Sequence, residues 1–202
     1  MSLNFTLMEK INYLQFKKSL QAVGKSYFSV NDLKKFYQGS DKNFKVLLSR
    51  WHKKEMIFRL IRGYYAFYLS QVDYLHLANE IDPNSYISFE YALYYYNLID
   101  QVPSVVTLAT KKRSRTIKAG NLVFEYVRLK SELCFGYDLK EKIYIASPEK
   151  ALADLFYLLA RGKRIAELDT LRLKKINIKK FKEILRHYPH YVFKKAQQAL
   201  NI

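Results

Sequence analysis

The chain is poor in cysteine, glycine and acidic side chains, and each shortage excludes a class of protein. A single cysteine, Cys134, allows no internal disulfide and no cysteine-based zinc cluster, which favours a reducing compartment. All six glycines stand singly, so the glycine-rich loops that cradle phosphates in nucleotide-binding enzymes are absent. No apolar run approaches the ~20 residues that a membrane-spanning helix needs, and the start of the chain has no secretory signal. We therefore expect a cytoplasmic protein that makes no membrane contact.

The shortage of acidic residues leaves a strongly basic chain. Lys and Arg number 35 against 18 Asp and Glu, for a net charge of +17, which points to nucleic acid or an acidic protein as partner. Residues 1–70 carry 13 basic and 4 acidic side chains, and residues 71–202 carry 22 and 14. The first third is thus about twice as densely charged as the rest. With 202 residues, 50% of them hydrophobic, the chain can bury the core of one large or two small domains.

Two helix starts follow one another in the basic first third. Ser29 and Asp32 have the spacing of a capping box, which predicts a short helix after Ser29. Gly39 stands where that helix would end in the left-handed conformation. Ser40 then caps a second helix that runs to about Lys54.

The second predicted helix has an apolar and a cationic side. At about 100° per residue, Phe44, Leu47, Leu48 and Trp51 cluster on the side expected to face inward. Residues 57–61 and 64–68 are β-prone runs joined by Arg62-Gly63, the composition of a tight hairpin. An additional helix is expected over residues 6–23, with Leu7, Ile11, Leu14, Phe16, Leu20 and Val23 inward. Residues 1–75 are therefore predicted to form a winged helix-turn-helix domain.

In a winged helix-turn-helix the second helix lies in the major groove of duplex DNA. From Lys34 to Arg62 there are nine Lys and Arg against two acids, a local charge of +7 that suits a polyanion. Lysines on ordinary solvated helix faces would explain the charge alone equally well, but the hairpin that follows the helix favours DNA. The side chains expected to contact DNA are Lys42, Lys45, Val46, Ser49, Arg50, Lys53, Lys54 and Arg62.

Residues 76–202 are predicted to form a mixed α/β domain with a helical tail, which makes the whole chain α+β. A turn at residues 82–85 marks the boundary region, and Ser85 or Ser88 is expected to cap the next helix. Strands are expected over residues 105–110, 122–129, 134–136 and 143–146. Ser147-Pro148 then starts a largely buried helix that ends at Gly162, and residues 165–202 are expected to form short helices.

Five cations lie between the first two of these predicted strands, which indicates a sheet with a strongly basic hairpin tip. Such a tip is either a second contact, to DNA or to an acidic protein surface, or simply a solvated loop. The five residues are Lys111, Lys112, Arg113, Arg115 and Lys118.

Catalytic signatures are sparse. The four histidines lack the spacing of a metal site, and neither a cofactor nor a metal is expected. The best enzyme interpretation is a metal-dependent nuclease that uses Glu125, Asp138 and Lys140, because a carboxylate pair can hold Mg²⁺ and a lysine can stabilise developing charge. We expect no enzyme.

The chain resembles the AbiEi antitoxins of type IV toxin-antitoxin systems and related winged-helix transcriptional regulators. The most distinctive part of the resemblance is Ile145-Ala146-Ser147-Pro148-Glu149-Lys150-Ala151-Leu152-Ala153-Asp154. Further parts are Ile61-Arg62-Gly63-Tyr64-Tyr65, Tyr86-Ile87-Ser88-Phe89-Glu90-Tyr91-Ala92-Leu93, the strand at 105–110 with the basic residues after it, and Phe135-Gly136.

The resemblance implies a winged helix that binds repeats in its own promoter and a carboxy-terminal domain that neutralises a cognate nucleotidyltransferase-like toxin. By analogy, Lys42, Lys45, Ser49, Arg50 and Lys53 would meet DNA, and Arg62 would lie at the wing tip. The motif at 147–154 is interpreted as a capped strand-to-helix junction. The alternative that stays open is a winged-helix regulator with no toxin partner.

Overall fold

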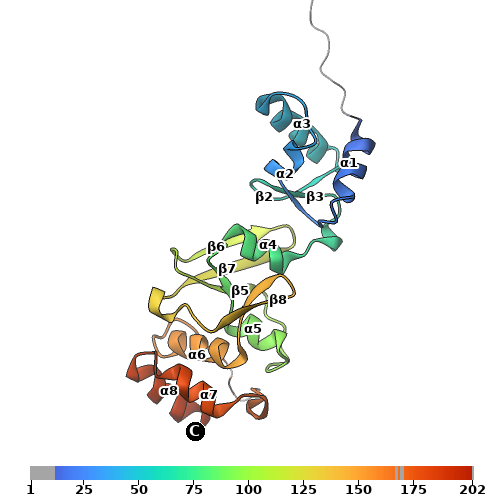
Figure 1. Cartoon of the computed structure of the whole chain (residues 1–202). Coiled ribbons are helices and arrows are strands. Elements are labelled where there is room, and N and C mark those ends of the chain that lie inside the picture. Colours follow the sequence, from blue (N-terminus) through green and yellow to red (C-terminus); the bar gives the residue numbers. More distant parts are fainter. Residues whose placement is uncertain (1–11, 167, 169–170, 202) are drawn as a thin grey trace, which may run out of the picture. The chain divides into compact units, whose positions relative to one another are not determined.

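The computed structural model describes residues 12–166, 168 and 171–201 as an α+β protein (Figure 1). The chain divides into two compact units, each described by itself below. The first unit comprises residues 12–73 and 119–121, and the second comprises residues 74–118 and the described residues from 122 to 201. No helix in these described ranges is long and apolar enough to cross a membrane.

The first unit combines three helices with a small sheet (Figure 1). The three strands pair in the antiparallel order β1-β3-β2. A 3-10 turn, η1, spans Leu69–Gln71. The elements are α1 (Tyr13–Gln21), β1 (Phe28–Ser29), α2 (Val30–Lys34), α3 (Asp41–Lys53), β2 (Phe58–Ile61) and β3 (Tyr64–Ala66).

The predicted helix caps of the first unit are confirmed. The Ser29 hydroxyl accepts a hydrogen bond from the backbone N–H of Asp32, whose carboxylate accepts one from the backbone of Ser29. The Ser40 hydroxyl accepts from Asn43 N–H at 3.2 Å. Gly39 was predicted wrongly, because it is not left-handed. An added Cβ at this position would lie 2.6 Å from the Tyr37 ring, so any larger residue would require that ring to move.

An aromatic core holds the first unit together. The rings of Phe16 on α1 and Trp51 on α3 lie 5.0 Å apart, and those of Tyr37 and Phe44 stack at 4.6 Å. Burying such rings contributes roughly 1.5–3 kcal/mol each. The other buried members of this core are Leu20, Phe28, Leu33, Leu48, Ile57 and Phe67.

The inward face predicted for the first helix is only partly right. Leu14 and Val23 are exposed at 72% and 48%. Leu7 and Ile11 lie outside the described residues, as does the predicted start of the helix.

The second unit is built on a six-stranded mixed sheet in the order β6-β7-β5-β4-β9-β8. The pairs β5/β7 and β4/β9 are parallel, whereas β4/β5 and β8/β9 are antiparallel. The strands are β4 (Tyr86–Ile87), β5 (Val106–Thr110), β6 (Arg115–Ala119), β7 (Leu122–Arg128), β8 (Tyr137–Lys140) and β9 (Ile143–Ala146). The helices are α4 (Tyr74–Ile81), α5 (Phe89–Tyr95), α6 (Pro148–Leu159), α7 (Ile178–Leu185) and α8 (His190–Leu200), with 3-10 turns η2 (Ser131–Leu133) and η3 (Leu173–Lys175).

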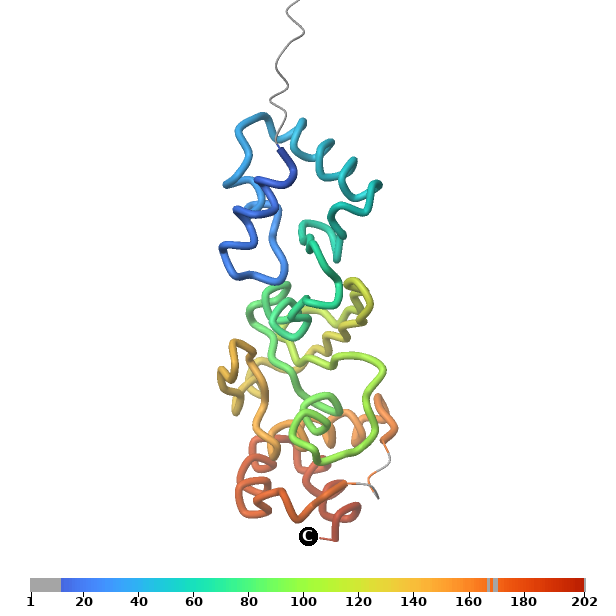
Figure 2. The backbone as a smooth tube through the Cα atoms, turned by 90° about the vertical axis from the view of Figure 1, so that its right-hand side faces the viewer, coloured from blue at the N-terminus to red at the C-terminus, as the bar shows by residue number. Residues whose placement is uncertain are grey.

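Helix α6 forms the centre of the second unit. Ser147 caps it and Pro148 opens it, as predicted, and every side chain from Glu149 to Leu158 is buried. Helices α5, α7 and α8 pack against α6, so the predicted helical tail is confirmed (Figure 2). A hydrophobic helix covered on several sides is expected where the sequence shows few polar positions.

Two predicted features of the sheet are wrong. Residues 134–136 form no strand, because the 3-10 turn η2 leads into an irregular segment. The tip of the β6/β7 hairpin is Gly120-Asn121 and is not basic. The basic run instead forms residues 111–114, which connect β5 to β6 and are called the basic connection below, and most of β6 itself.

Candidate nucleic-acid interface

Helix α3 separates its apolar and cationic residues cleanly. Phe44, Leu48 and Trp51 are buried in the core of the first unit. At 100° per residue, the opposite side carries an exposed group within an arc of about 100°. This group, which we call the outer face of α3, consists of Lys42, Lys45, Val46, Ser49 and Lys53.

No cation of the outer face lies within ion-pair distance of a carboxylate in the described ranges, although the charge of Lys45 helps to lower the pKa of Asp41. Two neighbouring acids are engaged elsewhere in the unit. Asp32 lies 3.2 Å from Lys25 and 3.7 Å from Lys35, whereas Asp41 pairs with Lys34. The hydrogen bond and charge of Lys34 lower the pKa of Asp41 below its usual value. The positive charge of the outer face is therefore available to an external anion.

The end of α3 is fixed to the short segment that leads into β2. The backbone N–H of Met56 donates to the Trp51 carbonyl at 2.9 Å, and a ring nitrogen of His52 lies 3.2 Å from the carbonyl oxygen of Ile57. Glu55 turns the chain in the left-handed region, at φ 55°. Such contacts orient the helix before any ligand is bound, which lowers the entropy cost of binding.

The β2/β3 hairpin is anchored beside the start of α2. Its turn is Arg62-Gly63, as predicted, with Gly63 at φ +91°. The Gly63 carbonyl accepts a hydrogen bond from Val30 N–H at 2.8 Å, and β1 pairs with β3. Arg59 and Arg62 are exposed. The hairpin thus presents two guanidinium groups, that of Arg59 from strand β2 and that of Arg62 from the turn.

The other predicted contact residues on α3, Arg50 and Lys54, are exposed at its carboxy-terminal end. Arg50 lies about 60° round the helix from Lys53, at the flank of the outer face. Val46, 43% exposed, stands among the cations and offers a methyl surface beside the Ser49 hydroxyl. Cations suit phosphates, and a small apolar group with a hydroxyl suits base edges.

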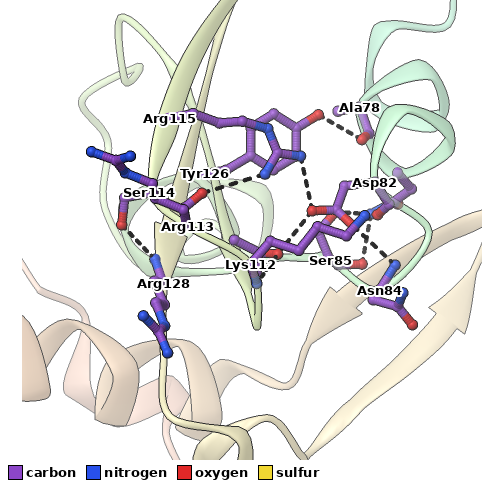
Figure 3. Close-up of polar contacts among 12 residues, drawn as sticks. Ala78, Asp82, Asn84, Ser85, Lys112, Arg113, Ser114, Arg115, Tyr126 and Arg128 are labelled. Atoms are coloured by element: carbon purple, nitrogen blue, oxygen red, sulfur yellow. Dashed lines mark hydrogen bonds and ion pairs between the residues drawn. The ribbon is translucent and has the colours of Figure 1, made fainter.

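In the second unit, a buried carboxylate binds two of the five predicted cations (Figure 3). Asp82, with no exposed side-chain surface, lies 3.0 Å from the Lys112 ammonium group and accepts a hydrogen bond from Arg115 at 2.9 Å. The Thr110 hydroxyl donates to the same carboxylate at 2.8 Å, and the Arg115 guanidinium lies over the Tyr126 ring. Lys112 and Arg115 are thus engaged within the unit.

The remaining cations of that group do not form one cluster. Lys111 and Arg113 are exposed where β5 ends and have no ion pair within the described ranges. Lys118 lies farther along β6, roughly 10 Å from Arg115. Sequence reasoning missed Arg128, which pairs with Thr110 across β5/β7 and donates its backbone N–H to the Ser114 hydroxyl. Only strand pairing brings it beside the basic connection.

The motif at 147–154 contributes a buried polar cluster. Lys150 and Asp154 are both inaccessible and pair with each other. The Lys150 ammonium group also donates to the hydroxyls of Tyr86 and Tyr188 at 3.0 and 2.7 Å. Ser88 occupies the N-cap position of α5, one of the two positions predicted for it. Its side chain forms no cap hydrogen bond, because its hydroxyl donates to Asp154 at 2.7 Å. The cluster joins β4, the start of α5, α6 and the turn between α7 and α8, and it is closed to solvent.

The residues of the predicted nuclease site do not come together. Glu125 on β7 accepts a hydrogen bond from Arg164 at 3.0 Å, whereas Asp138 and Lys140 lie on β8. Three strands separate β7 from β8, which places them roughly 19 Å apart. A shared Mg²⁺ is excluded at that separation. In the parts of the chain that the structure describes, no group of three or more His, Cys, Asp or Glu could hold a metal ion.

Comparison with protein-family models and with curated proteins gives no match. The functional assignment therefore depends on the geometry above and on the resemblance stated from the sequence.

Proposed function

We propose that the first unit is a winged helix-turn-helix that binds duplex DNA, and that the chain is a transcriptional repressor without catalytic activity. The observation that carries this proposal is the outer face of α3. Three lysines stand there without an ion pair in the described chain, on a helix whose other side is packed into an aromatic core.

The order of the elements supports the proposed fold. Helices α1, α2 and α3 are followed by a hairpin, and β1 completes the sheet β1-β3-β2. In this arrangement α3 is the recognition helix and the β2/β3 hairpin is the wing. The hydrogen bond from Val30 to the hairpin turn fixes the wing against the helix pair.

The side chains of the interface divide into two roles. Lys42, Lys45 and Lys53 neutralise phosphates and give an affinity that depends on salt but not on sequence. Val46 and Ser49 reach base edges, where a thymine methyl group or a base acceptor suits them. Arg62 at the hairpin turn contacts the DNA phosphate backbone next to the bases that α3 reaches.

Binding to the chain's own promoter DNA tests the proposal. We expect Lys45→Ala/Lys53→Ala to weaken binding at least tenfold without a change in thermal stability, since both side chains are exposed. A matched control is Lys179→Ala/Lys194→Ala, which removes the same charge from exposed positions of the second unit. Equal affinity of the two double variants, measured by fluorescence anisotropy, would reject the recognition-helix assignment.

The antitoxin role is part of the proposal and depends on the resemblance alone. A nucleotidyltransferase-like toxin encoded beside this chain would be its partner. Co-expression of the neighbouring gene tests this: growth arrest by that gene product, relieved by the chain, is expected. A neighbouring product that is harmless, or toxic whether or not the chain is present, would leave a repressor with no toxin partner.

Lys111 and Arg113 are proposed as a second basic contact. They are the exposed, unpaired members of the basic connection, and a fixed connection favours a defined contact over a solvated loop. Lys111→Ala/Arg113→Ala is expected to reduce repression or toxin neutralisation. Full retention of both activities would show that the segment is an ordinary solvated surface.

A further inference from the structure

The two edges of the six-stranded sheet differ in chemistry. Strand β6 forms one edge and carries Arg115 and Lys118, a single sign of charge that discourages pairing with another copy. Strand β8 forms the other edge and carries Asp138, Leu139 and Lys140, which together have no net charge. All three side chains are exposed, and Leu139 is 60% exposed. An open edge with an exposed leucine is a template for pairing with another strand.

The backbone of β8 is ready to pair at Leu139. Strands β8 and β9 are joined by a two-residue turn, with Lys140 opposite Ile143. Residues that flank such a turn form a hydrogen-bonded pair, and bonding alternates along an antiparallel ladder. The N–H and C=O of Leu139 therefore face away from β9, toward the open edge.

The side chains of β8 are complementary to themselves in one register. If two copies of β8 run antiparallel about a two-fold axis at Leu139, Leu139 faces Leu139 of the second copy. Asp138 of each copy then faces Lys140 of the other, which gives two opposite-charge pairs. A shift of the axis to Asp138 would place two carboxylates opposite each other. Charge thus selects the register centred on Leu139.

We propose that two copies of the chain associate through β8, in antiparallel pairing centred on Leu139. Leu139 and its cross-strand neighbour Tyr144, 39% exposed, supply the apolar contact. The association continues the sheet across the two-fold axis, which satisfies the open backbone groups of both edges. It does not depend on the proposed DNA binding, although it would give a repressor two recognition helices.

Charge reversal tests the register directly. Asp138→Lys places lysine opposite Lys140 of the second copy, and Lys140→Asp places aspartate opposite Asp138. We expect each variant alone to raise the dissociation constant of the dimer at least tenfold by sedimentation equilibrium. An equimolar mixture of the two variants should dimerise again, because every facing pair is then opposite in charge. The double variant Asp138→Lys/Lys140→Asp should dimerise by itself.

Lys118→Asp on β6 is the matched control. It makes the same change of charge as Lys140→Asp at the opposite edge, so dimerisation should be unaffected. Circular dichroism checks that every variant is folded. A wild-type chain that stays monomeric at several hundred micromolar would overturn the proposal. So would single variants that dimerise normally, or a mixture that is no stronger than its components.

Discussion

At the scale of single residues, Asp82 fixes the basic connection of the second unit. Burial by itself raises the pKa of this carboxyl group, but the bonds from Arg115, Lys112 and Thr110 outweigh that effect and lower the pKa below its usual value. The ionised form is therefore favoured by folding. The stabilisation is fully present above the unfolded pKa of about 4 and is lost as the pH falls through the lower folded value.

Asp82→Asn should lower the free energy of unfolding at pH 7 by about 2 kcal/mol, because hydrogen bonds to a charged group are lost. The variant should also lose less stability than the wild type as the pH falls below about 4. Urea denaturation over a pH series measures both effects. If the free energy of unfolding changed with pH in the same way in both proteins, the role assigned to Asp82 would be contradicted.

A second residue-scale feature is the buried pair of Lys150 and Asp154. Burial lowers the pKa of Lys150, while the charge of Asp154 and its hydrogen bond oppose that change. Three hydroxyl groups complete the cluster, those of Ser88, Tyr86 and Tyr188. Both charged groups therefore have several polar partners. Such partners are needed to offset the cost of removing two charges from water.

Lys150→Met should destabilise the chain by about 3–5 kcal/mol, because it leaves the Asp154 carboxylate buried without its counter-charge. Lys150→Met/Asp154→Leu should recover most of that loss. Thermal and urea unfolding of the single and double variants measure the difference. A double variant less stable than Lys150→Met would show that the pair contributes through its hydroxyl partners rather than through charge compensation.

At the scale of elements, local signals predicted local structure well. The caps at Ser29, Ser40 and Ser147 were all predicted from the sequence, because a cap involves residues only three positions apart. The turn at Arg62-Gly63 was also predicted, because its signal lies in two adjacent residues. Strand β4 was not predicted. It has only two residues, which is too short for a periodic pattern, and it is held in place by pairing with β5 and β9, which are distant in the sequence.

The β8/β9 hairpin carries a strained element. Its turn residues, Glu141 and Lys142, both have positive φ, 46° and 71°, which only glycine and asparagine adopt cheaply. Glu141→Asn/Lys142→Gly should therefore stabilise the chain by about 1 kcal/mol and raise Tm by roughly 2–4 °C. Differential scanning calorimetry measures the shift. A lower Tm would show that the side chains of the turn, including the contact between Tyr95 and Glu141, outweigh the strain.

At the scale of the whole molecule, the basic charge gives a quantitative expectation for the proposed repressor. With about six phosphate contacts, log K for promoter DNA should fall against log salt with a slope of about −5. Lys45→Ala/Lys53→Ala should make the slope shallower by about 2, as two contacts are removed. Titrations at several salt concentrations measure both slopes. A slope near zero would contradict a phosphate-dominated interface.

The sequence by itself determined the α+β class, the capped helices, the amphipathic α3 and the hairpin turn. These features follow from residues near one another in the chain, whose spacing fixes their conformation. Only the tertiary structure decided which charges are free. Asp82 meets Arg115 across 33 positions, and Glu125 and Asp138 are separated by the order of the strands. The partner of a charge is set by strand pairing between distant segments, and spacing along the sequence does not contain that information.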